Sequence, residues 1–437
     1  MTSSCPMDIL SEDGDIDNAM TTYKSGEDEC SKLIYEIDLE SSKSSETSLH
    51  SLNISQCGLS CWNKSIKNEN GGDASWNKAV SDHISITKFR HKIGIIIEDK
   101  YKVIESIAKG KQGSVYYGID LETNEKVAFK FDHNCGANCS LTLEYQIYKK
   151  LNERKNTGIP RLLYFTFEYE TPVLITELLG PSLQSLLSFC GGKFGFQTTI
   201  SIGIQMLDRL QYIHSYGFVH RDLKPENFVI GLSDNENIIY LVDYGLSCSY
   251  KYIDDTTTTT NSNNVSKEIP CKKRKTIVGT ANYVSLNTHN GYEISRRDDL
   301  ESLCYILIEF FMGTLPWKKS ALRNVSQNND RIGESKEKMN IKEVCGAMEN
   351  FYNYCKSLSF SDEPNYDYLK KCLRNLKYEN SFFKDERDDM YTWIFKRENN
   401  VSCKNKFYLN FRWCSEVEYF DKQKENDVEI GVFGMDN

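Results

Sequence analysis

Alternating apolar and polar residues predict the first ordered region of the chain near residue 100. Residues 101–118, YKVIESIAKGKQGSVYYG, alternate on both sides of a glycine-bearing turn, which is the pattern of two strands joined over a ligand. A further strand is predicted at residues 127–130, and apolar residues then recur at helical spacing in residues 141–148. The pattern predicts a small sheet region with one helix.

Helical patterns dominate farther along the chain. Residues 173–183, VLITELLGPSL, form an apolar strand that stops at a Gly-Pro pair and enters a helix, and residues 198–214 have the helical apolar period. Residues 303–312, LCYILIEFFM, are the most apolar run. Because this run is far shorter than the roughly 20 residues that span a membrane and contains an acid, we expect a buried helix.

Two biased stretches lack this patterning. Residues 1–97 are rich in Ser, Asp, Glu and Asn. They contain too few apolar residues to build a core, so we expect them to be largely disordered. Residues 256–264, TTTTTNSNN, predict a mobile insertion.

A run of chemically specific residues follows the helical segment. Residues 220–227 read HRDLKPEN, and Asp243-Tyr244-Gly245 comes after an apolar strand. Together they resemble the catalytic loop and the metal-binding loop of a protein kinase. Phosphoryl transfer needs a base, a cation beside the phosphate and metal ligands. The motif assigns a proton-accepting base, a phosphate-binding cation and two Mg²⁺ ligands, in this order, to Asp222, Lys224, Asn227 and Asp243.

The predicted hairpin is the expected ATP-binding loop. Its candidate residues are Ile107, Ala108, Lys109, Gly110, Lys111, Gln112, Gly113, Ser114 and Val115. Gly110 and Gly113 would let the backbone approach the phosphates, and Val115 would cover the adenine. The loop departs from G-x-G-x-x-G at Ala108, whose methyl group restricts the backbone without removing a phosphate ligand.

Other ATP-site candidates lie in the next strand, the helix and a predicted hinge, and they are Ala128, Lys130, Glu144, Thr176, Glu177 and Leu179. Residues 127–130, VAFK, match V-A-I-K, so Lys130 would bind the α- and β-phosphates and pair with Glu144. Thr176 would border the back of the adenine pocket. Glu177 and Leu179 would offer backbone hydrogen bonds to the base.

Three longer segments carry a more specific resemblance. Residues 177–183 (ELLGPSL), 279–289 (GTANYVSLNTH) and 295–303 (SRRDDLESL) closely resemble the casein kinase I family of Ser/Thr kinases, and the resemblance extends from about residue 101 to residue 393. It implies an α+β, bilobal protein kinase fold, with an antiparallel sheet and one helix in the N-lobe, a mainly helical C-lobe and ATP in the cleft. The implied organisation is an extension at 1–97, a catalytic domain at 98–395 with lobes of about 98–178 and 179–395, and a tail at 396–437.

Tyr244 of the metal-binding loop and His220 of the catalytic loop are expected to have structural roles. Tyr244 replaces the Phe that is usual for casein kinase I, as in the related vaccinia-related kinases. We expect its ring to pack between the lobes and its hydroxyl to find a partner. His220 is expected to support the catalytic loop by packing rather than by acid–base chemistry.

The resemblance implies protein substrates with acidic or phosphorylated segments, but one position departs from it. The Arg that usually follows Gly-Thr-Ala is Asn282, so recognition of a phosphorylated priming residue is in question. Residues 272–275, KKRK, could read the acidic charge instead, because Lys and Arg pair well with carboxylate and phosphate. A solvated charge run and a nuclear-import signal are the alternatives.

Composition limits the remaining function classes. The formal net charge of −9 gives no global basic footprint, so no nucleic-acid partner is expected. The 15 cysteines are scattered and no secretory signal opens the chain, which predicts reduced thiols and a location in the cytoplasm or nucleus. The pairs Cys57/Cys61 and Cys135/Cys139 lack the second pair that a zinc finger needs. No lipid-anchor signal ends the chain, and we expect a monomer without a membrane anchor.

The sequence therefore predicts an ATP- and Mg²⁺-dependent Ser/Thr protein kinase. A catalytically weak kinase-fold scaffold that binds partner proteins is the alternative, motivated by Ala108 and Asn282. A small-molecule kinase of the same broad fold is disfavoured by the peptide-site region at residues 279–287.

Overall fold

The computed structural model describes residues 92–110, 113–132, 140–168, 171–253, 266–274, 276–320, 325–379 and 391–411. All of them belong to one compact unit, Trp62–Asn437. The predicted disorder of residues 1–97 concerns residues 1–91 outside this description, but its end is wrong, because Ile96 and Ile97 form a strand and Ile97 is completely buried. The predicted mobility of residues 256–264 also concerns a part of the chain outside this description. Lys111, Gln112 and both cysteine pairs also lie outside it.

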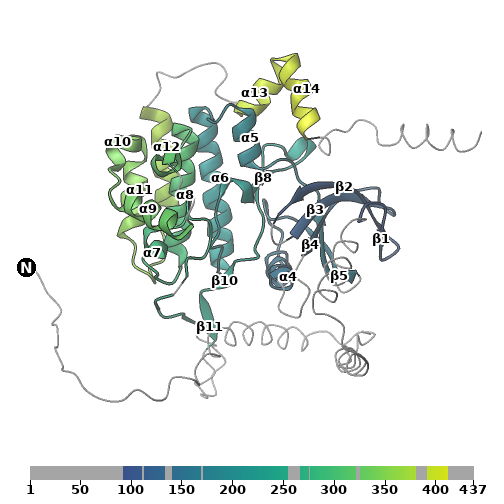
Figure 1. Cartoon of the computed structure of the whole chain (residues 1–437), viewed down its shortest axis with the longest axis horizontal. Helices are drawn as coiled ribbons and strands as arrows, with labels where there is room; N and C mark the ends of the chain where they lie inside the picture. The colour runs from purple at the N-terminus through teal and green to yellow at the C-terminus, as the bar shows by residue number, and fades with distance from the viewer. Residues whose placement is uncertain are drawn as a thin grey trace, which may run out of the picture. The chain divides into compact units, whose positions relative to one another are not determined.

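One antiparallel sheet forms the N-terminal lobe. Its six strands lie in the order β1-β2-β3-β4-β6-β5 (Figure 1). The strands are Ile96–Ile97 (β1), Tyr101–Lys109 (β2), Gly113–Asp120 (β3), Lys126–Asp132 (β4), Leu162–Glu168 (β5) and Thr171–Glu177 (β6). The predicted hairpin is confirmed as β2 and β3, and the strand predicted at residues 127–130 lies in β4.

The alternation that predicted these strands gives the sheet one buried face. Buried and half-buried residues alternate strictly along β3. Tyr116 of β3 meets Phe131 of β4 edge-to-face, with ring centroids 5.5 Å apart, and both belong to a cluster that includes Val103, Phe129 and Ile175. Burial of these large side chains stabilises the lobe.

Helix α4, Ser140–Leu151, connects this sheet to the rest of the protein (Figure 1). Residues three or four positions apart share one face of a helix, and Leu141, Ile147 and Leu151 are almost completely buried on this face. They belong to the same hydrophobic cluster as the core of the large lobe. Glu144 lies on the same face and is 2% exposed, so packing of α4 fixes the position of this carboxylate.

The C-terminal lobe is mainly helical. Its helices are α5 (Leu183–Phe189), α6 (Phe196–Ser215), α7 (Leu286–His289), α8 (Arg296–Met312), α9 (Val325–Glu337), α10 (Ile341–Cys345), α11 (Glu349–Ser357) and α12 (Tyr366–Glu379). Helices α6 and α11 pack against α8, whose residues from Leu303 to Ile308 are completely buried. The buried helix predicted from the most apolar run is thereby confirmed.

Three short antiparallel strand pairs lie on either side of the two loop motifs or just after them in the chain. They are β7 (Phe218–Val219) with β10 (Cys248–Ser249), β8 (Phe228–Ile230) with β9 (Ile239–Leu241), and β11 (Lys251–Ile253) with β12 (Ser266–Glu268). The catalytic-loop motif lies between β7 and β8, and the metal-loop motif lies between β9 and β10. The two motifs are therefore presented by neighbouring strand ends.

Two further helices pack on the large lobe, α13 (Thr392–Glu398) and α14 (Val401–Asn410). Trp393 is completely buried, with its ring 5.6 Å from that of Phe194, and Phe407 meets Phe189 at 5.4 Å. Arg397 forms a bidentate ion pair with Glu236 through contacts of 2.6 and 2.9 Å. The packed helices continue into the segment that the sequence analysis assigns to a tail.

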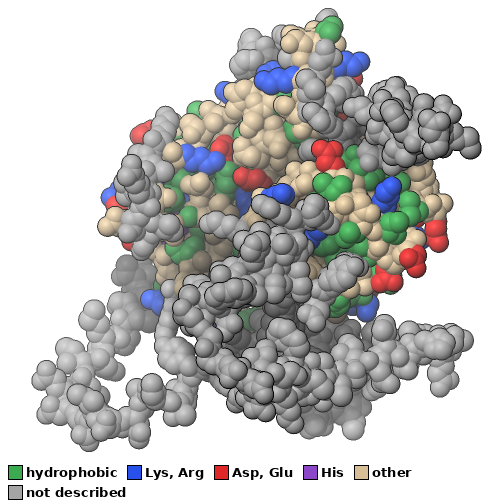
Figure 2. Space-filling view, turned by 45° about the vertical axis from the view of Figure 1, so that its right-hand side comes forward, with side chains coloured by type: hydrophobic (Ala, Val, Ile, Leu, Met, Phe, Trp, Pro, Cys, Tyr) green, Lys and Arg blue, Asp and Glu red, His purple; other side chains and the backbone are tan. Residues whose placement is uncertain are grey.

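The described surface is mixed in charge. On the face shown in Figure 2, basic and acidic side chains are interspersed rather than gathered into one patch. Within the described ranges, none of the helices combines the length and the apolar character that a membrane crossing requires.

Candidate active site

The candidate base, Asp222, is fixed by two donors. Lys224 Nζ donates to its Oδ2 at 2.6 Å, and Thr280 Oγ1 donates to its Oδ1 at 2.7 Å. Asp222 is 6% exposed, so both contacts act in a sheltered environment where they orient the carboxylate strongly. The loop motif predicts Lys224 beside the transferring phosphate, and the structure places its Nζ on Asp222, while Thr280 belongs to the family signature at residues 279–289.

The backbone of the catalytic loop is held by Asp299 from helix α8. Its Oδ2 accepts the His220 N–H at 2.7 Å, and its Oδ1 accepts the Arg221 N–H at 3.0 Å. The second contact helps to hold Arg221 at a φ of +67°, a left-handed conformation that is unfavourable for a residue with a side chain. Burial by itself raises the pKa of Asp299, but hydrogen bonding from His214 and the neighbouring charges outweigh it and lower the pKa overall. Asp299 is therefore held as a carboxylate.

The two candidate metal ligands are brought together through the backbone. The Val242 N–H donates to Asn227 O at 3.0 Å, which places Asp243 beside the catalytic loop. The Asn227 side chain donates its Nδ2–H to Asp222 O at 2.9 Å, so its oxygen is the atom that could ligate a cation. A carboxylate and an amide oxygen fit Mg²⁺, which keeps part of its shell for water and phosphate. The described residues contain no group of three or more His, Cys, Asp or Glu that could hold another metal.

Lys130 bridges the two lobes. Its Nζ lies 2.6 Å from Glu144 Oε2 of helix α4 and 2.7 Å from Asp243 Oδ1. Lys130 lowers the pKa of Asp243 to about 2 by Coulomb attraction, against the opposing effect of burial. Burial lowers the pKa of Lys130, but the two carboxylates outweigh it and raise the pKa overall. Lys130 and Asp243 are therefore held in their charged forms, whereas burial raises the pKa of Glu144 against the attraction of Lys130. A lysine between these two carboxylates is the pairing expected of a catalytically competent kinase site.

The ring of Tyr244 is completely buried behind these groups. Its hydroxyl donates to Leu241 O at 3.0 Å, which confirms the expectation that this hydroxyl finds a partner. Tyr148 of helix α4 meets the ring edge-to-face at 5.0 Å, and the His220 ring lies 5.4 Å away. His220 is completely buried, and burial lowers its pKa. It supports the loop as a neutral ring, as expected.

The predicted ATP-binding loop joins β2 and β3. Ala108 lies opposite Val115 in the strand register, next to an irregularity at residues 106–108, and the Gly110 N–H donates to Gly113 O at 2.8 Å. Gly113 lies so close to β4 that a Cβ atom would collide with Phe131 O. Close packing of β3 on β4 therefore requires a glycine at this position. This reason differs from the expected one, which was approach of the backbone to the phosphates. Ile107 and Lys109 are in β2, and Ser114 is a buried residue of β3.

The predicted hinge begins with the last residues of β6. Thr176 lies opposite Ala128 of β4, so these two candidate adenine neighbours lie side by side on adjacent strands. The Glu177 N–H donates to Arg161 O at 3.1 Å, and the Glu177 carbonyl accepts from Thr176 Oγ1 at 3.3 Å. A hydrogen bond from a base to this carbonyl would therefore share it with the Thr176 hydroxyl. Leu179 is half-buried in the segment that leads to helix α5.

The basic run at residues 272–275 is attached to the loop that precedes α8. Arg274 Nε lies 2.8 Å from Glu293 Oε2, and the Arg274 N–H donates to Gly291 O at 2.6 Å. Lys272 and Lys273 are exposed, and Lys273 forms an isolated β-bridge with Tyr292. Arg274 is therefore occupied by an internal partner, whereas the two lysines present their charge to solvent.

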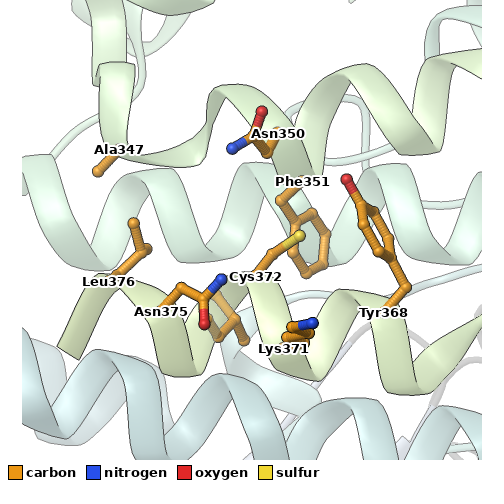
Figure 3. A pocket seen from close by; sticks show the side chains of 9 residues that line it. Ala347, Asn350, Phe351, Tyr368, Lys371, Cys372, Asn375 and Leu376 are labelled. Carbon is orange, nitrogen blue, oxygen red and sulfur yellow. The ribbon is translucent and has the colours of Figure 1, made fainter. Parts of the chain in front are cut away.

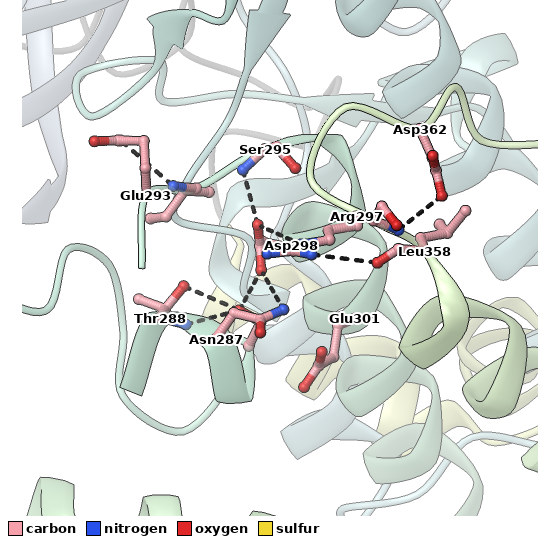
Figure 4. Close-up of polar contacts among 12 residues, drawn as sticks. Asn287, Thr288, Glu293, Ser295, Arg297, Asp298, Glu301, Leu358 and Asp362 are labelled. Atoms are coloured by element: carbon pink, nitrogen blue, oxygen red, sulfur yellow. Dashed lines mark hydrogen bonds and ion pairs between the residues drawn. The ribbon is translucent and has the colours of Figure 1, made fainter. Parts of the chain in front are cut away.

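The signature at residues 295–301 anchors the segment that follows Val284 (Figure 4). Asp298 Oδ1 accepts Ser285 Oγ–H at 2.6 Å, and Asp298 Oδ2 accepts the Ser295 N–H at 2.8 Å. Glu301 Oε1 accepts the Leu286 N–H at 2.8 Å. Three acids of one helix, Asp298, Asp299 and Glu301, thus position the catalytic loop and the segment that begins helix α7.

A separate hollow lies between η4 (Gly346–Met348), α11 and α12 (Figure 3). Its volume is about 280 Å³, and its lining includes Phe351, Tyr368 and Cys372. It shares no residue with the predicted nucleotide or catalytic groups, so it is not part of the candidate active site.

The comparison with known protein families agrees with this geometry. Residues 101–379 match the family model described as "Protein kinase domain", which is more than half of the chain. The matched region contains strands β2 to β6 of the sheet, helix α4, both loops and the supporting helix α8. The chain belongs to the protein kinase family.

Proposed function

We propose that the protein is an ATP- and Mg²⁺-dependent serine/threonine protein kinase of casein kinase I type. One observation carries the proposal: Asp222 is fixed between Lys224 and Thr280, while Lys130 pairs with both Glu144 and Asp243. A scaffold without catalysis would not need both a lysine that bridges two carboxylates and an oriented base in the same cleft. The intact set of charged groups favours catalysis.

The chain's own residues would divide the work of phosphoryl transfer. Asp222 would orient the acceptor hydroxyl and take its proton, and Thr280 holds the carboxylate in the required direction. Lys224 would lie beside the transferring phosphate. Lys130 would bind the α- and β-phosphates, and Asn227 with Asp243 would hold the cation. Bound Mg²⁺ would neutralise the charge of the phosphates.

The proposed substrates are proteins with acidic segments near the acceptor residue. Among the described residues of the basic run, which do not include Lys275, Lys272 and Lys273 are exposed and Arg274 is paired with Glu293. Asn282 brings no charge to the peptide side. We therefore propose that carboxylates spread along the substrate contribute more to recognition than a single phosphorylated residue does.

The test measures transfer of labelled phosphate from Mg-ATP to casein and to paired acidic and phosphoprimed peptides. We expect wild-type transfer to exceed that of Asp222→Asn by about 10²–10⁴-fold, the usual contribution of a positioned base. Equal, near-zero transfer by both proteins on every substrate would contradict the kinase proposal and support the scaffold alternative. A strong preference for primed peptides would contradict the proposed substrate class alone.

A further inference from the structure

A buried lysine lies behind the loop that follows Thr280. Lys336 is near the end of helix α9 and is 1% exposed. Lysine is rarely buried completely without partners, because removing its charge from water is costly unless hydrogen bonds compensate. Its partners therefore indicate what it does.

Two of these partners are backbone carbonyls of a single loop, and the third is a histidine of helix α7. Lys336 Nζ donates to Ala281 O at 2.8 Å and to Val284 O at 2.6 Å, and it lies 3.2 Å from His289 Nε2. Burial lowers the pKa of Lys336 well below its ordinary value. A neutral amine still carries two N–H donors, so both carbonyls keep a donor in either protonation state.

Neighbouring side chains hold the rest of the same loop. Trp317 Nε1 donates to Asn282 O at 3.0 Å, and the Trp317 ring also faces the Lys336 ammonium at 5.1 Å. Lys318 Nζ donates to the Tyr283 hydroxyl at 2.8 Å. The carbonyls of residues 281, 282 and 284 are thus all bound by side chains from η3 (Pro316–Ser320) or α9.

Helix α9 can come this close because of a glycine. A Cβ atom on Gly333 would lie 3.3 Å from the His289 ring, tighter than ordinary van der Waals contact. The absence of a side chain there lets α9 pack on α7. This packing carries Lys336 to the loop carbonyls.

The residue just before this loop, Thr280, is hydrogen-bonded to the candidate base Asp222. Thr280 donates to Asp222 Oδ1 at 2.7 Å, and the neighbouring Gly279 has a φ of +99° and packs against Arg221 O. A shift of residues 281–284 would therefore reach the peptide side of the cleft. Lys130, Glu144 and Asp243, which serve the nucleotide side, have no hydrogen bond to this loop among the described contacts.

We infer that Lys336 is a positioning residue for protein substrates, because it fixes the carbonyls of the loop along which the acceptor peptide would lie. The inference rests on the proposed kinase function. It predicts an effect on the KM for peptide that is separable from the KM for ATP.

The test compares Lys336→Met with Lys336→Arg and with Lys338→Met. Lys338 is two residues away, and its side chain is 75% exposed, so it is a matched control. We expect Lys336→Met to raise the peptide KM about tenfold, because two buried carbonyls lose their donor. The ATP KM should change less than about twofold. Lys336→Arg keeps the donors and should recover most of the peptide affinity.

A second variant covers the case in which Lys336→Met does not fold. Trp317→Phe replaces the indole with a smaller aromatic ring that lacks the Nε1–H donor to Asn282 O, and it should give a smaller shift of the same kind. Unchanged peptide KM in both variants would overturn the inference, as would an equal loss of peptide and ATP affinity. Absence of transfer by the wild type would instead contradict the proposed function.

Discussion

Lys130 shows how one residue depends on its partners in both lobes. Its Nζ is 2.6 Å from Glu144 and 2.7 Å from Asp243, and the Glu144 side chain is 2% exposed. Removal of one member of a buried ion pair leaves an uncompensated charge, which costs more than removal of both.

We therefore expect Lys130→Met to lower the free energy of unfolding by about 2–3 kcal/mol and to abolish measurable phosphate transfer. The double variant Lys130→Met with Glu144→Leu should recover much of the stability but none of the activity. Chemical denaturation monitored by tryptophan fluorescence, alongside a transfer assay, measures both effects. A double variant as unstable as the single one would contradict this account.

The depressed pKa of Asp243 predicts how stability depends on acid. Because its pKa in the folded protein is about 2, below the unfolded value of about 3.9, the carboxylate stabilises the fold above pH 4. This contribution is lost as the pH falls from about 4 to about 2. The side chain is 38% exposed, so solvent screening limits the effect to about 1 kcal/mol.

The difference between wild type and Asp243→Asn isolates this contribution. We expect the difference in unfolding free energy between the two proteins to shrink by about 1 kcal/mol on going from pH 5 to pH 2. Unfolding curves at several pH values measure it. A constant difference over that interval would show that Lys130 does not depress the pKa of Asp243.

At the scale of elements, acidic side chains of helix α8 hold the catalytic loop and the segment that begins helix α7. Asp299 accepts two backbone N–H groups of the catalytic loop and bonds His214 at 2.9 Å, while Asp298 and Glu301 hold the segment at residues 285–286. Each acid is almost completely buried. Helix α8 is rigid because it lies in the core, so it can hold two loops in a fixed relation.

Asp299→Asn should therefore disturb the catalytic loop, although Asp299 is not itself one of the candidate catalytic residues. We expect an unfolding free energy lower by about 2–3 kcal/mol, because buried donors lose a charged acceptor, and a kcat reduced more than the ATP KM is raised. The matched control is Asp330→Asn, an exposed position of α9. Thermal unfolding and steady-state kinetics test this, and equal effects of the two variants would contradict it.

At the scale of the whole molecule, the packed structure includes helices α13 and α14. Trp393 is 0% exposed and Phe407 is 2% exposed, and Arg397 pairs with Glu236. Their removal would uncover Phe189 and Phe194 of the large lobe.

Truncation after residue 390 should therefore lower the free energy of unfolding by about 3 kcal/mol or more, since loss of one large buried aromatic side chain alone costs 3–5 kcal/mol. Truncation after residue 411 keeps every described contact and is the control. Calorimetry of the two shortened proteins compares them. A stability of the shorter protein equal to that of the control would show that α13 and α14 contribute little.

The sequence by itself determined the fold class and the chemistry of the cleft. The strand pattern of residues 101–118 and the apolar run at residues 303–312 depend on local periodicity, and the loop motifs depend on residue types at fixed short spacing. Each of these patterns involves residues that are close together in the sequence, so each can be recognised without a structure.

Only the tertiary structure decided which residues support those groups. Thr280 meets Asp222 across 58 positions of the chain, Asp299 meets His220 across 79, and Lys336 meets Ala281 across 55. Nothing in the local sequence around the end of α9 distinguishes Lys336 from Lys338, whose side chain is 75% exposed. Burial and partners decide the role of a charged side chain, and both are created when distant segments pack together.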